Sequence, residues 1–353
     1  MGDPIHGRGA VSNPQHRFDA LIRQAEDDGW ARETEAVSLP DTRIIEQLAK
    51  TALSRNDSPD IPFDRSVTPY QGCEHGCVYC YARPSHAYHG LSPGLDFETR
   101  IIARPNIADI LRAELGRPGY RPAPVALGAN TDPWQPVERK LGITRRVLEV
   151  LAETRHPVTL VTKSSLVERD LDLLADLARD GLVHAAVSLA TLDADLARRL
   201  EPRAASPARR LKTLERLAAA GIPCAVLAAP MIPQLTDVDL EKVLEAARDA
   251  GARTAGYVLL RLPHELKDVF QDWLDAHYPM RAGHVMSLVR QMRDGEAYQA
   301  DFGVRQRGTG VHAELLARRM AVARRRLGLT GDLGPLAVDR FRPPGLPGQI
   351  SLF

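Results

Sequence analysis

Cysteine is scarce in this sequence: the 353 residues include only four, and aromatic residues make up 5%. So few cysteines in a long chain argue against a disulfide framework. No apolar run approaches the roughly 20 residues that span a bilayer, and residues 1–6 contain no apolar signal core. Basic and acidic residues nearly cancel, at 46 against 45, so the overall charge gives no case for nucleic-acid binding, although a local patch is compatible with it. We therefore expect a cytoplasmic globular protein.

Three of the four cysteines, Cys73, Cys77 and Cys80, stand within eight residues. Soft thiolate ligands select iron–sulfur clusters, zinc or copper(I). A [4Fe–4S] cluster normally takes four cysteines, one for each iron. The fourth cysteine, Cys224, lies far away in an apolar run. A cluster held by these three residues would keep one iron open to a small molecule, which is a catalytic arrangement.

A structural zinc site is the alternative use of these cysteines, with His75 as the fourth ligand. Structural zinc sites usually combine two separated ligand pairs, and four ligands so close together would be strained. The spacing therefore favours an iron–sulfur cluster. The sequence contains no second C-x2-C motif, so we expect no auxiliary cluster.

The C-x3-C-x-aromatic-C spacing, with Tyr79 before the last cysteine, resembles the signature of the radical S-adenosylmethionine (SAM) superfamily. More narrowly, residues 56–99 resemble a bacterial branch of that superfamily related to spore photoproduct lyase, and the resemblance runs from Gly7 to about Gly328. It implies a [4Fe–4S] cluster whose open iron binds SAM. It also implies reductive cleavage of SAM to a 5′-deoxyadenosyl radical that abstracts hydrogen, and an electron donor such as flavodoxin or ferredoxin.

From residue 66 onwards, short apolar runs alternate with amphipathic helical patterns, which predicts parallel βαβ units. The predicted strands are 66–70, 125–129, 158–162, 184–189, 225–229 and 256–260. The predicted helices between them are 107–115, 144–153, 167–179, 208–220 and 237–250. Six repeats suit an incomplete (β/α)6 barrel, the fold that the resemblance implies, while periodicity alone would also allow a doubly wound sheet.

We expect the chain to be organised in four parts. They are an N-terminal extension that wraps the core (1–60), the radical-SAM partial barrel (61–264), a C-terminal helical region (265–330) and a flexible tail (331–353). The helical region is predicted from periodic patterns, and the tail from its proline and glycine content.

Polar residues at the C-terminal ends of the predicted strands are candidates for holding SAM, because β/α barrels form their active sites there. The resemblance implies that Tyr79 lies against the adenine, Ser188 contacts the ribose and Arg203 pairs with the SAM carboxylate. Many relatives bind the methionine amine through a Gly-Gly-Glu stretch after the second strand. This chain departs from them and offers Asn130, Thr131 and Asp132 instead.

Two further strand ends carry charged candidates. Lys163 directly follows the third predicted strand, and because an unpaired buried charge is costly, we expect it to meet a carboxylate or a phosphate. Arg261 and His264 follow the sixth strand, and we predict that they contact the substrate; salt bridges to the C-terminal helices are the alternative. Spore photoproduct lyase uses an additional cysteine as hydrogen donor, and no cysteine matches that role here, since Cys224 is predicted on the opposite face.

The last five residues resemble the pentapeptide that binds the bacterial sliding clamp: Gln349, Ile350, Ser351, Leu352 and Phe353. A flexible tether would present Leu352 and Phe353 as anchors for an apolar pocket on a partner. The alternative is that the tail packs on its own barrel.

The sequence thus predicts a radical SAM enzyme, and a nucleic-acid lesion or modified base is the favoured substrate because of the lyase-like branch and the clamp-like tail. Two alternatives stay open. One is a zinc-bearing, non-enzymatic module associated with DNA or the clamp. The other is a radical SAM enzyme that acts on RNA or protein.

Overall fold

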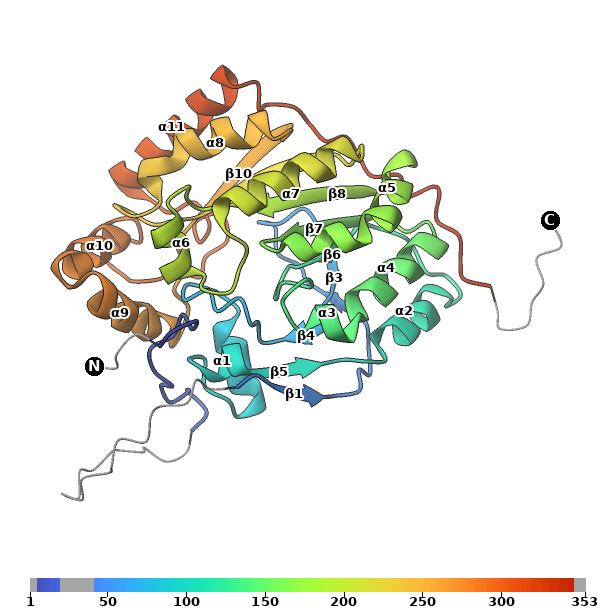
Figure 1. The fold of residues 1–353 in the computed structure, drawn as a ribbon, viewed down its shortest axis with the longest axis horizontal. Helices are drawn as coiled ribbons and strands as arrows, with labels where there is room; N and C mark the ends of the chain where they lie inside the picture. Colours follow the sequence, from blue (N-terminus) through green and yellow to red (C-terminus); the bar gives the residue numbers. More distant parts are fainter. Residues whose placement is uncertain (1–4, 20–40, 346–353) are drawn as a thin grey trace.

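A seven-stranded sheet runs through the centre of the protein in the computed structural model, which describes residues 5–19 and 41–345 (Figure 1). Its strands are β2 (Leu53–Arg55), β3 (Arg65–Val67), β6 (Val125–Leu127), β7 (Val158–Thr162), β8 (Val183–Ser188), β9 (Cys224–Met231) and β10 (Thr254–Leu259). Their order is β10-β9-β8-β7-β6-β3-β2. Every pair from β3 to β10 is parallel, and β2 runs antiparallel to β3.

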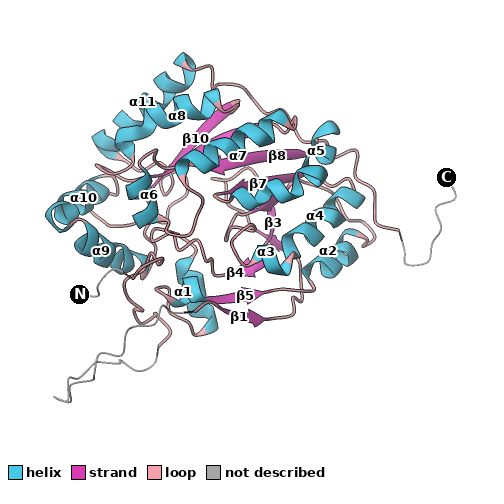
Figure 2. Ribbon diagram, in the orientation of Figure 1, coloured by secondary structure: helices cyan, strands magenta, loops and turns pink. Residues whose placement is uncertain are grey.

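Helical segments separate the parallel strands, as the alternating pattern predicts. They are α2 (Ile107–Leu115), α3 (Glu138–Leu141), α4 (Ile143–Glu153), η2 (Ser165–Asp170), α5 (Leu171–Arg179), α6 (Ala194–Leu200), α7 (Pro207–Ala219), η3 (Asp237–Asp239) and α8 (Leu240–Asp249). After β10 follow α9 (Leu266–His277), α10 (Pro279–Gln291) and α11 (Gly310–Arg326). In Figures 1 and 2 the helices α4, α5, α7 and α8 lie along one face of the sheet. Six parallel strands with these helices confirm the predicted incomplete (β/α)6 barrel.

A second sheet of three strands was not predicted. It has the order β1-β5-β4, with β1 (Arg43–Glu46) parallel to β5 (Arg100–Ala103) and β4 (Tyr70–Gln71) antiparallel to β5. The predicted strand 66–70 is therefore divided between the two sheets. Pro69 stands at the division, and because proline has no N–H to donate to a sheet, it favours the change of direction. The short helices η1 (Arg83–His89) and α1 (Asp96–Thr99) lie between β4 and β5.

The strand registers bring the carboxyl ends of the parallel strands to one edge. Leu127 of β6 pairs with Leu160 of β7, and Thr162 of β7 pairs with Val187 of β8. The loops that leave this edge after neighbouring strands must therefore start close together, which is where β/α barrels place their active sites.

Of the three clusters of buried apolar side chains in the described ranges, the two larger ones join most of the elements. The larger joins the strands to α2, α4, α5, α7, α8 and α11, with Leu160 and Val226 among its members. The smaller joins Cys77, Val78 and Tyr79 to α6, α9 and α10. Burial of apolar surface thus fixes the cysteine segment onto the helices around it.

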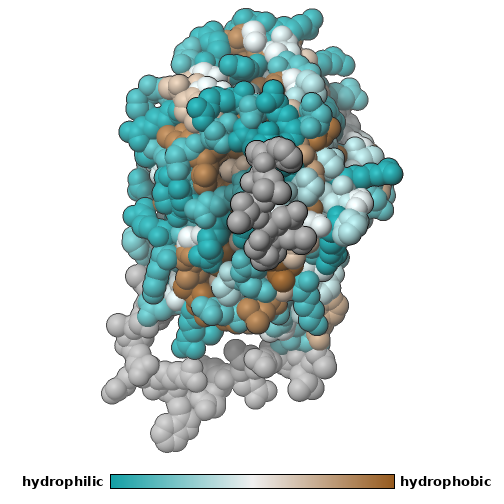
Figure 3. Space-filling view, turned by 90° about the vertical axis from the view of Figure 1, so that its right-hand side faces the viewer, coloured by the Kyte–Doolittle hydropathy of each residue, from teal (hydrophilic) through white to brown (hydrophobic). Residues whose placement is uncertain are grey.

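One face of the molecule is mainly polar. The side of the molecule turned to the viewer in Figure 3 is largely hydrophilic, with small apolar areas scattered among polar ones. Within the two described ranges, no helix has the length and apolar character needed to cross a membrane.

Candidate active site

The three cysteines lie in the loop of residues 73–80, here called the cysteine loop, which follows β4. Main-chain hydrogen bonds tie it to segments that leave the carboxyl edge of the large sheet. Val78 N donates to Leu200 O over 3.0 Å, and Arg203 N donates to His75 O over 3.2 Å. The loop therefore lies at the edge where the fold predicts an active site.

The cysteine thiols are free and close enough to influence one another's ionisation. Cys73 and Cys77 are buried, and Cys80 is half-buried. Burial raises the pKa of Cys77 to about 12. Burial, then the neighbouring Asp132 carboxylate and the other two thiols, raises the pKa of Cys73. Such thiols lose their protons readily only to a bound metal, so this donor set fits a metal cluster.

A single metal ion fits this loop less well than a cluster. Over residues 5–19 and 41–345, no three His, Cys, Asp or Glu side chains are grouped so that they could hold one ion. A zinc ion needs four ligands within about 2.3 Å, whereas each cysteine of a [4Fe–4S] cluster binds a different iron. The Nδ1 atom of His75 lies 3.4 Å from Asp132 Oδ2.

The segment after β6 carries the next three predicted residues. Thr131 is buried, and its hydroxyl donates to Tyr70 O over 2.6 Å. Asp132 accepts from the Thr162 hydroxyl over 2.8 Å and from Lys163 N over 2.7 Å. Through these bonds Asp132 links the segment after β6 to the end of β7. Asn130 is half-buried beside them.

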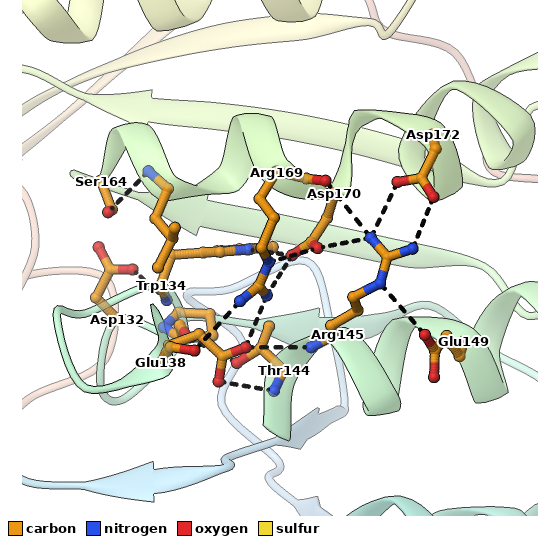
Figure 4. A network of polar contacts seen from close by, with 12 residues as sticks. Asp132, Trp134, Glu138, Thr144, Arg145, Glu149, Ser164, Arg169, Asp170 and Asp172 are labelled. Atoms are coloured by element: carbon orange, nitrogen blue, oxygen red, sulfur yellow. Dashed lines mark hydrogen bonds and ion pairs between the residues drawn. The ribbon is translucent and has the colours of Figure 1, made fainter. Parts of the chain in front are cut away.

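A buried polar network holds this segment in place (Figure 4). Trp134 Nε1 donates to Asp170 Oδ2 over 2.8 Å, and Arg145 forms an ion pair with the same carboxylate at 3.0 Å. Glu138, which is fully buried, accepts from Thr144 N over 3.0 Å and from Arg169 at 2.7 Å. Because each buried group has its partner, the loop that presents Asn130–Asp132 is rigidly supported.

Of the remaining predicted residues, Lys163 and Arg203 contact the cysteine loop, and Ser188 lies at the end of β8. The Lys163 ammonium lies 5.7 Å from the centre of the Tyr79 ring, a cation–π distance. Lys163 is also the charge that most opposes the raised pKa of Cys77. Ser188 is buried at the end of β8, where its hydroxyl is 3.3 Å from Ala229 O. Arg203 forms an ion pair with Glu74 at 3.1 Å.

The ion pair of Glu201 and Arg210 links Tyr79 to Ser188. The sequence analysis did not identify this pair. Glu201 is buried and receives hydrogen bonds from the Tyr79 hydroxyl and from Arg210. Burial raises the pKa of Glu201, and Arg210 opposes this rise. Arg210 also donates to Ser188 O over 3.0 Å. Its position on the apolar face of α7, between Pro207 and Leu214, is the sequence signal that could have identified it.

The two predicted substrate residues differ in their surroundings. The Arg261 guanidinium lies 5.0 Å from the centre of the Tyr81 ring, directly after the last cysteine, and 3.5 Å from the Tyr298 hydroxyl. Its Nε is buried and meets no acceptor in the described part of the chain. His264 is exposed, with a left-handed backbone at φ 50°.

The remaining cysteine lies away from the others. Cys224 begins β9 at the amino-terminal end of the strand, and its thiol donates to Ile222 O over 3.1 Å. The clamp-like motif at 349–353 lies outside the described residues.

Residues 67–247 match the sequence profile of the radical SAM superfamily. The chain is a member of this superfamily. An uncharacterised protein of Mycobacterium tuberculosis is 36% identical over 266 residues, which cover 74% of this chain and 78% of the relative. An uncharacterised protein of Methanocaldococcus jannaschii is 24% identical over 196 residues, 56% of this chain and 70% of the relative.

Solved structures of spore photoproduct lyase share the fold of this radical SAM chain. The complex of that lyase with a dinucleoside spore photoproduct has a TM-score of 0.59 at 15% identity, over 80% of this chain and 79% of the lyase. A lyase variant with bound SAM and the dinucleoside has a TM-score of 0.51 at 16% identity, over 67% of this chain and 66% of the variant. The cofactors of the superfamily are a [4Fe–4S] cluster and SAM, and the three thiols of the cysteine loop suit the first of them.

Proposed function

We propose that this protein is a radical SAM enzyme that acts on a nucleic acid, with a lesion or a modified base as the reacting group. The observation that carries the proposal is the loop of three free thiols at the carboxyl edge of the parallel strands, in a chain of the radical SAM superfamily. When bound, the reduced cluster supplies the electron that splits SAM into methionine and a 5′-deoxyadenosyl radical, which removes a hydrogen atom from the substrate. Flavodoxin or ferredoxin is the proposed reductant.

In this proposal Cys73, Cys77 and Cys80 hold the cluster, while Tyr79, Lys163, Ser188 and Arg203 line the place of SAM. Tyr79 and Ser188 are both fixed by Arg210, one through Glu201 and one through its carbonyl oxygen. Preorganised groups of this kind lower the cost of orienting a bound cofactor. Asn130 is the proposed contact for the methionine amine, since the carboxylate of Asp132 is already used between β6 and β7.

Support for a nucleic-acid substrate comes from exposed aromatic rings that have an arginine guanidinium over their face. Arg261 lies over Tyr81, which is 44% exposed. Arg17 lies 4.6 Å from the centre of the Phe18 ring and 5.3 Å from that of Tyr88. Bases stack on such rings, and arginine adds cation–π attraction. The dinucleoside in the lyase complex is a ligand of the same chemical class.

The test begins with anaerobic reconstitution by iron and sulfide, followed by dithionite and SAM. We expect 5′-deoxyadenosine from the wild type, none from Cys77→Ala, and an unchanged yield from the control Cys224→Ala, because Cys224 lies at the other end of the sheet. A colourless protein that holds zinc and makes no 5′-deoxyadenosine would contradict the radical SAM reaction and favour the non-enzymatic module.

The substrate class requires its own measurement. We expect single-stranded oligonucleotides to bind with a salt-dependent affinity, and Tyr88→Ala to weaken binding by roughly 1–3 kcal/mol if a base stacks there. The control is Met280→Ala, because Met280 of α10 is 96% exposed and offers no aromatic ring on which a base could stack. Equal binding by wild type and Tyr88→Ala would contradict stacking at Tyr88, and no oligonucleotide binding by the wild type would favour a protein substrate.

Recruitment by the sliding clamp through Gln349–Phe353 is part of the same proposal. Leu352 and Phe353 would supply the apolar anchors. Deletion of the five residues should abolish clamp binding and leave 5′-deoxyadenosine formation unchanged. An unchanged clamp affinity would remove recruitment from the proposal.

A further inference from the structure

Residues 7–14, here called the N-terminal strap, lie against the cysteine loop although 59 or more residues separate the two in the sequence. Ala10 is fully buried and packs in the same apolar cluster as Cys77, Val78 and Tyr79. In Figure 1 the dark blue start of the chain lies between α1 and α9, on the side where the strap meets the loop. The strap is therefore an outer wall of the candidate active site.

One buried carboxylate holds the strap. Glu98 is fully buried, and its two oxygens accept from Gly9 N over 2.9 Å and from Ala10 N over 2.8 Å. The same carboxylate pairs with Arg83 at 2.5 Å, and neither side chain is exposed. A buried carboxylate with a cationic partner and two amide donors is fully satisfied, so it fixes the groups around it.

Arg83 connects this carboxylate to the cysteine loop. Its Nε donates to Cys77 O over 2.8 Å, and one terminal nitrogen donates to Gly76 O over 3.1 Å. The other terminal nitrogen donates to Pro93 O and Gly94 O over 3.0 and 2.8 Å. The Arg83 guanidinium therefore binds the main chain of the cysteine loop at Cys77 and the main chain of the segment before α1.

Close backbone packing seals the strap onto the loop. A Cβ atom at Gly9 would lie 1.8 Å from Gly76 O, so no side chain fits between the two segments. At Gly94 a Cβ atom would lie 2.2 Å from Ser12 O. Asn13 exchanges two hydrogen bonds with Asp96, over 2.9 and 3.0 Å. The strap therefore packs on the loop at Gly9 and on the segment before α1 at Ser12 with no space for an added side chain.

We propose that the strap is a working part of the cluster site: through Glu98 and Arg83 it sets the conformation of the cysteine loop, and by covering the loop it keeps water and oxygen from the cluster. Gly9, Arg83 and Glu98 are positioning residues in this account, since none is a proposed ligand. The inference rests on the proposed [4Fe–4S] cluster. It adds that the N-terminal extension determines how firmly and in what environment the cluster is held.

The experiment compares wild type with Gly9→Val, Glu98→Gln and the matched control Gly283→Ala, at a glycine in α10 whose added Cβ meets nothing within 4 Å. Iron per protein, the rate of bleaching in air and the midpoint potential of the cluster are measured after anaerobic reconstitution. Because loss of a group that supports a metal ligand typically costs about 10–100-fold in metal affinity, we expect at least tenfold faster cluster loss in both strap variants. Solvent access should also shift the potential, a change that a purely structural role would not cause.

Asn13→Ala keeps the test decisive if the first two variants do not fold. It removes only hydrogen bonds at the surface, and we expect a smaller increase in bleaching with the same direction of potential shift. Wild-type values of iron content, bleaching and potential in the folded variants would overturn the inference. If the wild type itself takes up no cluster, the proposed function fails, and that result differs from equal retention by wild type and variants.

Discussion

At the amino-terminal edge of the large sheet, each of α5, α7 and α8 passes into the next strand through a short turn. A glycine with positive φ closes each turn, at Gly181, Gly221 and Gly251. At the carboxyl edge, long irregular segments are held by buried side chains from distant parts of the chain, such as Glu201 to Tyr79 and Glu98 to Gly9. The first edge is specified by local sequence and the second by contacts between remote residues, and the second is where the chemistry is placed.

The largest effect should come from breaking a buried pair at the carboxyl edge. Arg83→Gln leaves Glu98 buried without its cationic partner, which typically costs about 3–5 kcal/mol. Urea unfolding of the protein without cluster measures this free energy. A loss below 1 kcal/mol would mean that the carboxyl edge does not depend on the Arg83–Glu98 pair.

The amino-terminal edge also contains a polar contact between residues far apart in the sequence, that of His156 with Tyr120. Its effect can be compared with that of the Arg83–Glu98 pair. His156 is buried against the Tyr120 hydroxyl, 2.8 Å from its Nε2, and burial lowers its pKa to about 4. The unfolded chain binds a proton near pH 6.5 and the folded chain does not, so stability is present above that pH and falls as the pH drops towards 4. The slope is roughly 1.4 kcal/mol per pH unit for one such group.

The measurement is the free energy of unfolding at pH 7 and pH 5 for wild type and His156→Gln. The variant should lose less stability than the wild type over this interval. Burial also lowers the pKa of His86 to about 4, so His86 contributes to the pH dependence of stability in both proteins. Parallel pH profiles would contradict the assignment of this dependence to His156.

A smaller effect is expected from the glycine turns. Gly181→Ala places a side chain at φ 66°, and a left-handed residue costs about 1–2 kcal/mol. Gly251→Ala should cost more, because the added Cβ would also lie 2.6 Å from the Ala218 Cβ. Thermal unfolding of the two variants tests this ranking, and an equal or larger loss in Gly181→Ala would contradict it.

The smallest change should follow from Arg112→Ala. Arg112 pairs with Glu153 at 2.6 Å on the surface, where both side chains are more than 40% exposed. Exposed ion pairs contribute about 0–1 kcal/mol because solvent screens them. A loss comparable to that of Arg83→Gln would show that exposure does not distinguish the two pairs.

The regular elements were predictable because their signals are local. The pattern at 158–162 coincides with β7, and that at 107–115 coincides with α2. The second sheet was missed, since β1 is a four-residue strand with exposed side chains and pairs with β5 across 57 residues of sequence. The alternation of apolar and polar residues carries no information on such a pairing.

The site was predictable only in part for the same reason. Spacing identified Cys73, Cys77 and Cys80 as a ligand set, because three thiols in one short segment are informative by themselves. Nothing local marks Glu98 as the anchor of the strap, since its partners Gly9 and Ala10 stand almost 90 residues earlier. Arg83 likewise shows no pattern that separates it from an exposed arginine.

The contacts of the strap can form only at different stages of protein synthesis. The residues of the strap are synthesised before the cysteine loop, but Ser12 bonds to Asp272 of α9 across 260 residues, and the neighbouring Arg17 pairs with Glu265 across 248. These contacts can form only after α9 has been translated. Contacts of such long sequence separation form slowly. The bonds of Gly9 and Ala10 to Glu98 can form as soon as α1 has been translated. Until α9 follows, the strap can therefore be held over the cysteine loop only through Glu98.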